Sequence, residues 1–555
     1  MKTILYGLFL LLLLGGSFML LRSIEPDREV AGPSPRFPGA VSPDVATIDV
    51  ERLDESDPQQ MYELGVEFMR MWRVREATVV LEHAVAADST RADSWTRLAE
   101  CYAHPLIDDE DALGFAIMRA LAVAGADTAY AAGLRLLYLD RDYSGAVTAF
   151  AGVLREKGDA NEARYHLALA YFLLGRLDEC ERQLDPLMRT DASVGPVVEL
   201  YIRQAVAAGE LDRAADAARE LARMYTEEPF PYVLIAQVEM ARGDRAAAAE
   251  FCNNALVLDP RCIPAIMTRA LLYADAGDFE ASRVSYEKLM LFDEMVLKSI
   301  GQEGIGFVDF MAGEFDDGID AMDEAIRLAM QGGATGRGLS LSLRLVDYLC
   351  QLGQADNAEN VVERWVTGFG EVPVRLARAR IQVLRGDFPS AATVLEALSN
   401  DKEWVLWSRA LSLDVTELSA LADIGQQRQK EALAILAAES TATAVSAGAG
   451  ARRTFLAGYA AFESGDAERA AAAFASVRER LYGPEFPYHG DPVLYVQSMF
   501  VLAESDLARG NRESAQTSYQ AFIACWGNAA WDLEAVARAR KKIEALGGLE
   551  QPPHG

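Results

Sequence analysis

Apolar residues recur along most of the chain at the spacing of amphipathic helices, and short glycine-containing turns separate these stretches. Four turns made of a glycine and a following polar residue lie 34 residues apart: Gly175, Gly209, Gly243 and Gly277. The same turn continues at less regular intervals: Gly313, Gly353, Gly386, Gly465 and Gly510. Glycine suits the end of a helix because it adopts left-handed backbone angles without steric cost. The pattern predicts antiparallel helix pairs repeated along the chain.

A second feature repeats in step with the turns, five positions after each glycine. The residue there is small in every pair: Cys180, Ala214, Ala248, Ser282, Gly318, Ala358, Ala391, Ala470 and Ala515. Larger apolar residues follow in the next turn of several helices: Leu184, Tyr286, Met322, Leu395, Phe474 and Tyr519. Two helices in a tight hairpin approach closely only where one of them presents a small side chain. We therefore expect the small residues at the helix crossings.

The unit Phe230–Arg261 shows the full pattern within one repeat. Its first helix begins with Tyr232, Gly243-Asp244 make the turn, and Asp259-Pro260 end the second helix. This unit, with the 34-residue period, resembles the tetratricopeptide repeat (TPR) family. The resemblance extends from Pro58 to about Gly547 and implies an all-α fold, a superhelical solenoid of helix–turn–helix repeats.

The chain divides into six segments by composition. We expect a membrane span at 1–22, a proline-rich spacer at 23–57, a repeat array at 58–398, an irregular repeat or hinge at 399–452, C-terminal repeats with a cap at 453–547, and a disordered tail at 548–555. In the last repeat, Trp526 and Trp531 are expected to cover the open end of the solenoid, which needs such a cap.

The segment Ile4–Leu21 carries no charged residue. As a helix it would be about 27 Å long, which suits a bilayer core. A cleaved signal peptide is the alternative, although no small-residue cleavage site follows. Lys2 precedes the segment, so we expect the N-terminus inside and the body outside the cytoplasm, in a bacterial periplasm or its equivalent.

The composition narrows the range of partners. The formal net charge is −30 and the sequence pI is about 4.6, which opposes binding to nucleic acid and to anionic lipid. The six cysteines form no CxxC pair, and only Cys252 and Cys262 are close enough in sequence to suggest a disulfide. A core of this size needs no such crosslink.

Motifs for catalysis or metal binding are missing from the sequence. The five histidines show no metal-ligand spacing, and there is no G-x-S-x-G, P-loop or HExxH motif. The glycine-rich stretch Gly332–Gly338 lacks the lysine of a phosphate loop, and we interpret it as a linker. The acidic run Asp108–Asp111 lacks the spacing of a calcium loop and is expected to be a solvated face. We therefore expect no catalytic residue, metal, cofactor or small-molecule substrate.

The family resemblance places a partner-binding groove on the first helix of each repeat. On the regular units this face consists of Tyr165, Leu169, Phe172, Glu199, Arg203, Val233, Gln237, Met240, Met267 and Leu271. We expect a groove more apolar than one that clamps a carboxylate, suited to an amphipathic or extended apolar segment. The alternative is that several of these side chains only pack against the neighbouring repeat.

Two functions are compatible with these features. The first is a membrane-anchored interaction scaffold that binds a peptide or helix of a partner in an envelope complex. The second is a non-catalytic accessory or sensor subunit of an envelope enzyme or export system. The sequence names no partner, because a fold does not by itself supply a function.

Overall fold

A computed structural model describes residues 57–547, apart from 124–127, 158–159, 191–194, 400–414, 439–446 and 480–489. The expected membrane span at Ile4–Leu21, the spacer up to residue 56 and the tail at 548–555 lie outside these described residues. Among the helices that are described, none has the length and apolar character needed to cross a membrane.

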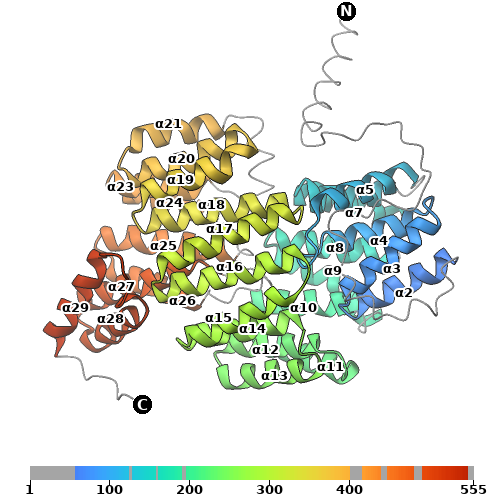
Figure 1. Ribbon diagram of the computed structural model, residues 1–555, viewed down its shortest axis with the longest axis horizontal. Helices are drawn as coiled ribbons and strands as arrows, with labels where there is room; N and C mark the ends of the chain where they lie inside the picture. Colours follow the sequence, from blue (N-terminus) through green and yellow to red (C-terminus); the bar gives the residue numbers. More distant parts are fainter. Residues whose placement is uncertain are drawn as a thin grey trace, which may run out of the picture. The chain divides into compact units, whose positions relative to one another are not determined.

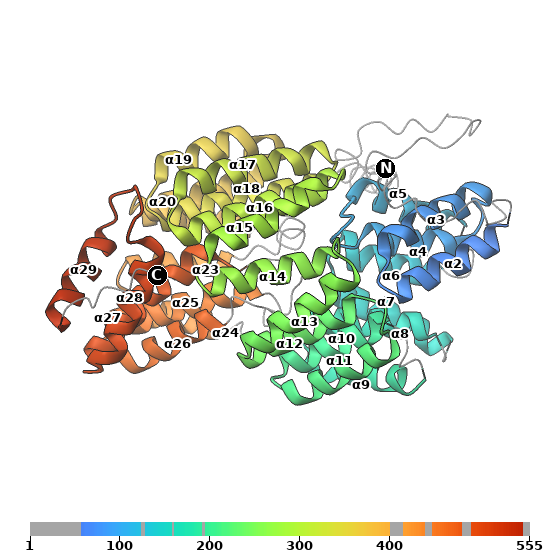
Figure 2. The ribbon, with the colours of Figure 1, turned by 60° about the horizontal axis from the view of Figure 1, so that its bottom comes forward.

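The described residues form helices and turns without any strand, which confirms the all-α prediction. The N-terminal helices are α2 (Pro58–Arg70), α3 (Val74–Ala87), α4 (Ala92–Tyr102), α5 (Glu110–Val123), α6 (Thr128–Leu134), the π-helical turn η4 (Arg135–Leu139), α7 (Tyr143–Glu156), α8 (Asn161–Leu173), α9 (Leu177–Thr190), α10 (Gly195–Ala207), α11 (Leu211–Met224), α12 (Phe230–Arg242) and α13 (Arg245–Leu258). Each packs against the next, as Figure 2 shows for α9 to α13.

The chain continues with the same alternation. The following helices are α14 (Ile263–Asp275), α15 (Phe279–Glu287), η5 (Lys288–Leu291), α16 (Met295–Ala312), α17 (Phe315–Gln331), α18 (Thr335–Gln351), α19 (Ala355–Val361), η6 (Val362–Val366), η7 (Thr367–Phe369), α20 (Glu371–Leu384) and α21 (Phe388–Ser399). The last described helices are α23 (Val415–Gly425), α24 (Gln429–Ala438), α25 (Ala447–Glu463), α26 (Ala467–Glu479), α27 (Pro492–Ala508), α28 (Arg512–Trp526) and α29 (Glu534–Leu546). Figure 1 shows this succession of helices.

All nine predicted turn glycines adopt left-handed backbone angles, with φ between 69° and 85°. At Gly243, which ends α12, the following Asp244 N–H donates to the Glu239 carbonyl at 2.9 Å. The Gly243 N–H donates to the Met240 carbonyl at 2.9 Å. These two bonds satisfy carbonyls that the end of a helix would otherwise leave unpaired.

The residue after the turn glycine begins the second helix of several pairs. Asp244 accepts a hydrogen bond from the Ala247 N–H at 3.0 Å, and Asp278 accepts one from the Ala281 N–H at 3.1 Å. A carboxylate in this position caps the free N–H groups of the first helical turn. The glycine–aspartate pair therefore ends one helix and starts the next, which makes each hairpin tight.

The small residues after the turns lie at the crossings, as predicted. All nine are buried, and so are the larger residues that follow them in the next helical turn. At Gly318, an added Cβ atom would lie 3.1 Å from the Phe310 ring. The hairpin α16–α17 therefore depends on a residue without a side chain at this point.

Four connections between described helices use other residues in the left-handed conformation. Trp72, Asp108, Arg141 and Gln427 have φ of 58°, 48°, 46° and 62°. Gln427 connects α23 to α24 inside the segment 399–452, so this hairpin lacks the glycine that marks the others. Trp72 connects α2 to α3.

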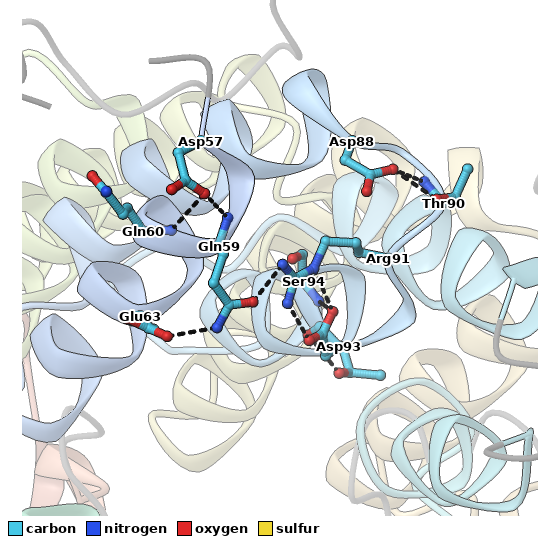
Figure 3. Close-up of polar contacts among 10 residues, drawn as sticks. Asp57, Gln59, Gln60, Glu63, Asp88, Thr90, Arg91, Asp93 and Ser94 are labelled. Carbon is cyan, nitrogen blue, oxygen red and sulfur yellow. Dashed lines mark hydrogen bonds and ion pairs between the residues drawn. The ribbon is translucent and has the colours of Figure 1, made fainter. Parts of the chain in front are cut away.

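The N-terminal end of the described array is closed by polar contacts between α2 and α4 (Figure 3). Asp57 caps α2 by accepting from the Gln59 N–H at 2.9 Å. The Gln59 amide oxygen accepts from Arg91 at 2.6 Å, and Arg91 pairs with Asp93 at 2.6 Å. These contacts connect the starts of two first helices in successive repeats.

The expectation that Trp526 and Trp531 cover an open end is wrong. The indole N–H of Trp526 donates to the Phe310 carbonyl at 3.0 Å, and its ring meets the Phe315 ring edge-on at 5.3 Å. Trp531 also packs on Phe315, at 4.8 Å. The C-terminal helices therefore dock on the hairpin α16–α17, because its aromatic side chains offer a large apolar surface.

Burial corrects one further expectation and answers one question that the sequence left open. Asp109 in the acidic run is 4% exposed and caps α5 by accepting from the Ala112 N–H at 2.8 Å, so this residue is no part of a solvated face. Cys252 and Cys262 are both buried free thiols. The Cys252 thiol donates to the Ala265 carbonyl at 3.0 Å instead of forming a disulfide.

Candidate functional site

A pocket of about 830 Å³ lies among the N-terminal repeats. Its walls come from the turn between α2 and α3, the end of α4 with the loop that follows, one face of α8 and one face of α10. The connections that lead into α12 and α14 complete it. We refer to this cavity as the inner pocket. It combines apolar side chains with charged groups, several of which form ion pairs with one another.

Four of the predicted groove residues line the inner pocket: Tyr165, Leu169, Glu199 and Arg203. They come from α8 and α10, so the first helices of two successive repeats do face one cavity. Glu199 and Arg203 form an ion pair at 2.7 Å across one turn of α10. The sequence therefore located one wall of this pocket.

The other predicted groove residues lie outside the inner pocket. Phe172, Val233 and Met267 are buried in clusters of core side chains. Met240 and Leu271 are partly buried and pack against such clusters, and Gln237 is partly buried. Their part in partner binding stays a prediction, and their packing matches the alternative interpretation, in which such residues contact neighbouring helices.

The expectation of a groove more apolar than one that clamps a carboxylate stays a prediction, and charged residues line the inner pocket beside the apolar ones. Six arginines line it: Arg70, Arg73, Arg75, Arg97, Arg203 and Arg261. Seven carboxylates accompany them: Glu76, Glu100, Glu162, Glu199, Glu227, Glu228 and Asp259. Charges of both signs are therefore interleaved along the lining of the pocket.

The wall of the pocket beside α8 is a buried polar group around His166. The ring Nδ1 lies 2.9 Å from the Glu162 carbonyl, which can only accept, so Nδ1 carries the proton. The Tyr130 hydroxyl donates to Glu100 at 3.0 Å, and Glu100 pairs with Arg97 at 2.7 Å. The remaining nitrogen, Nε2, is buried without a hydrogen bond and lies 3.7 Å from Glu100.

Burial controls the protonation of both histidines in this pocket. It lowers the pKa of His166 to about 4, against the attraction of the Glu100 carboxylate. The pKa of His104 falls to about 4 for the same reason, with a further contribution from Arg203. Both rings are therefore neutral near pH 7, and the charge of this wall comes from the arginines and carboxylates.

Several carboxylates line the opposite end of the pocket. Burial raises the pKa of Glu228, Arg73 opposes this rise, and repulsion from Glu76 and Asp259 adds to it. Because burial is the main cause, the raised pKa reports the loss of water around the Glu228 carboxylate. Arg73 and Arg261 line the same pocket.

The turn between α2 and α3 forms the wall that faces α10. The indole N–H of Trp72 donates to Glu199 at 2.8 Å. The Trp72 ring also contacts Phe230 at 5.1 Å and Tyr225 at 5.9 Å between ring centroids. A left-handed backbone costs a residue with a side chain about 1–2 kcal/mol, so the structure keeps a tryptophan here against its backbone preference.

The described residues around the pocket hold neither a cluster of metal ligands nor a thiol that is ionised near pH 7. Within the described ranges, no group of three or more histidine, cysteine or carboxylate side chains is arranged to hold a metal ion. Cys262 lines the pocket, but burial raises the pKa of its thiol to about 12, so it is protonated near pH 7. Apolar contact, ion pairing and hydrogen bonding are what the pocket residues offer.

Comparison with known families identifies the repeats. Models of the tetratricopeptide repeat match residues 137–198 and 372–397. The chain contains tetratricopeptide repeats. The first match runs from η4 to the start of α10 and includes the pocket residues of α8, and the second covers most of α20 and α21.

Solved structures with some likeness to this chain include the two that follow. Yeast Tom70 is 14% identical with a TM-score of 0.36, over 82% of this chain and 96% of that one. A tetratricopeptide repeat protein from Parabacteroides merdae is 16% identical with a TM-score of 0.27, over 56% of this chain and 97% of that one. No curated protein matches the sequence.

Several residues of the inner pocket escaped the sequence analysis. They lie in connections between TPR helices, as Trp72, Glu228 and Asp259 do, whereas the prediction used only first helices. One signal in the sequence pointed to them: the first hairpin places Met71-Trp72-Arg73 where later hairpins place a glycine turn. A large aromatic residue at such a turn indicates a specific contact.

Proposed function

We propose that this TPR protein is an interaction scaffold that binds a peptide or helical segment of a partner protein in the inner pocket. The observation that carries the proposal is the pocket itself, which is formed by two successive first helices together with four inter-helix connections. Its volume of about 830 Å³ is within the range of cavities that enclose a ligand.

The lining residues favour a segment with both apolar and charged side chains. Leu169, Leu200 and Phe230 offer apolar contact, while the paired Glu199 and Arg203 can exchange partners with an incoming segment. A cationic side chain on that segment would pair with the carboxylate of Glu228 in the lining. Such a combination fits an amphipathic segment better than a purely apolar one.

We further propose that the scaffold is anchored in a membrane through Ile4–Leu21, with its body outside the cytoplasm in a bacterial envelope. The uncharged apolar run and the preceding Lys2 support this. The test is membrane fractionation after alkaline extraction, with Leu13→Lys as the variant. Retention of the variant in the pellet to the same extent as the natural chain would contradict an anchor at this segment.

Photocrosslinking in native membranes tests the binding pocket. A photoreactive phenylalanine derivative replaces Leu169, which lines the pocket, or Thr148, an exposed residue of α7 that does not line it. We expect a specific partner to be captured from position 169 and not from position 148. Capture from both positions alike, or from neither, would overturn the pocket as the binding surface.

A non-catalytic accessory subunit of an envelope enzyme is the second candidate, and the same experiment separates the two. If the captured protein is an enzyme whose activity depends on this chain, the accessory role applies. If it is a structural component, the scaffold role applies. In either case the proposed contact is a protein segment in the inner pocket.

A further inference from the structure

The first hairpin differs from the glycine hairpins in the residue at its turn. Trp72 occupies the position that glycine holds elsewhere, since the Arg73 N–H donates to the Phe68 carbonyl at 2.9 Å in the same pattern as Asp244 to Glu239. Its φ of 58° is unfavourable for a residue with a bulky side chain. The hairpin therefore carries backbone strain that a glycine would remove.

The contacts of the Trp72 side chain offset the backbone strain at this turn. Trp72 reaches across to residues that lie more than a hundred positions further along the chain: it donates to Glu199 on α10 and packs on Tyr225 and Phe230. The first residue of α10, Gly195, leaves room for it. A Cβ atom on Gly195 would lie 2.4 Å from the Arg70 carbonyl oxygen and 2.5 Å from the Trp72 ring.

A second contact holds the same hairpin. Arg75 at the start of α3 forms an ion pair with Glu294, and its guanidinium group lies 5.5 Å from the centre of the Phe292 ring. Both arginine and glutamate are largely buried. The hairpin α2–α3 is thus fastened by Trp72 on one side and by Arg75 on the other, with the inner pocket between these contacts and α8.

We infer that the hairpin α2–α3 is a clasp that closes the inner pocket and opens to admit the partner segment. Opening breaks the hydrogen bond of Trp72 to Glu199, its two ring contacts and the contacts of Arg75 with Glu294 and Phe292, together with the packing of α2 on α10. The packing of α2 on α3 and of α3 on α4 stays intact. An opening of this kind needs far less free energy than global unfolding. The inference rests on the proposed function, since it concerns access to the same pocket.

The experiment is hydrogen exchange of the full chain, read by mass spectrometry, for the variants Trp72→Gly and Gly195→Ala. The first removes the side chain that fastens the clasp, and the second pushes the hairpin away while Trp72 is kept. We expect exchange to become about tenfold faster at the α2–α3 hairpin and at the starts of α10 and α12, because the packing of Trp72 on Tyr225 and Phe230 stabilises the closed clasp by about that factor.

Two control variants separate the clasp from other effects. Gln427→Gly relieves a left-handed turn that has φ of 62°, and Gly114→Ala adds a methyl group where no atom lies within 4 Å. Neither is expected to change exchange around α2, α10 or α12. The inference is overturned if Trp72→Gly changes exchange only at its own turn, equally along the whole chain, or not at all.

Photocrosslinking from position 169 then tests the clasp as a gate. We expect the yield at short irradiation times to rise several-fold when Trp72→Gly is added. An equal yield with and without Trp72→Gly would overturn the gate. Capture of no partner in either chain would count against the proposed function alone, and the exchange pattern would then decide the clasp by itself.

Discussion

His166 shows how one buried side chain makes stability depend on pH. Its pKa is lowered to about 4, chiefly by burial, from an ordinary value of 6.5. Below pH 6.5, His166 is protonated in the unfolded chain but stays neutral in the folded chain. Its contribution to stability is therefore present above pH 6.5 and is lost as the pH falls toward 4. Arg97 and Glu100 are the charged groups that face it.

We predict that His166→Gln reduces the loss of stability between pH 7.5 and pH 5 by about 2 kcal/mol. The measurement is the free energy of unfolding in urea at the two pH values. His83→Gln is the matched control, because His83 is exposed. Asp109 and Asp309 have raised pKa values of about 6, so their contributions to the stability of the fold increase on acidification. Both residues are present in the natural chain and in the two variants, so their effect cancels in the comparison. Equal pH dependence in the two variants would contradict the prediction.

Gly304 and Gly114 are both inside helices, and an alanine should have opposite effects at the two positions. A Cβ atom at Gly304 in α16 would lie 2.2 Å from the Tyr286 ring, whereas one at Gly114 in α5 would meet nothing within 4 Å. We predict that Gly304→Ala destabilises by about 1–3 kcal/mol through overpacking. Gly114→Ala should stabilise by about 0.5–1 kcal/mol. Thermal unfolding checks both, and destabilisation of the same size at both sites would refute the packing argument.

At the scale of the helix, the cap at the start of each second helix contributes to the hairpin. Asp278 caps α15, while Gln354 holds the same position before α19 without a side-chain cap. We predict that Asp278→Ala lowers the free energy of unfolding by about 1 kcal/mol. Gln354→Ala should change it by less than about 0.5 kcal/mol. Denaturant midpoints of the two variants decide the matter, and a Gln354 effect as large as that of Asp278 would be the contrary result.

The glycine turns were predictable because their cause is local. A left-handed backbone is required where one helix ends and the next begins, and glycine meets this requirement in the sequence itself. The turn at Gln427 meets the same requirement with another residue, so no pattern marked α23 and α24. The wall of the pocket at Leu169 was found for a similar reason, since it belongs to a regular first helix.

The rest of the pocket was not predictable from the period of the repeats. The period specifies how each unit packs on its neighbour, whereas Trp72 meets Glu199 across several units. Val233 and Met267 hold the same position in the pattern as the pocket residues, yet they are buried among core side chains. Whether a residue at this position lines the pocket or is buried in the core depends on the curvature of the repeat array. That curvature is the sum of many small packing angles between helices, and no single residue encodes it.

At the scale of the whole chain, the docking of the C-terminal helices on α16 and α17 is a second long-range contact. Trp526 is 2% exposed and meets both Phe315 and the Phe310 carbonyl. We predict that Trp526→Ala costs about 3–5 kcal/mol and makes residues 490–547 susceptible to limited proteolysis. Trp365→Ala is the control, because Trp365 bonds to Asp323 away from this contact. Equal proteolysis of the two variants would contradict the docking.

The contact of Trp526 with Phe310 and Phe315 also has a consequence for the nascent chain during synthesis. Trp526 lies 216 residues after Phe310, and ribosomes add about 5–20 residues per second. The hairpin α16–α17 therefore leaves the ribosome about 10–40 s before its covering helices exist. During this interval the aromatic surface around Phe315 is exposed to solvent. We expect chaperones to bind this surface on nascent chains halted between α17 and α27.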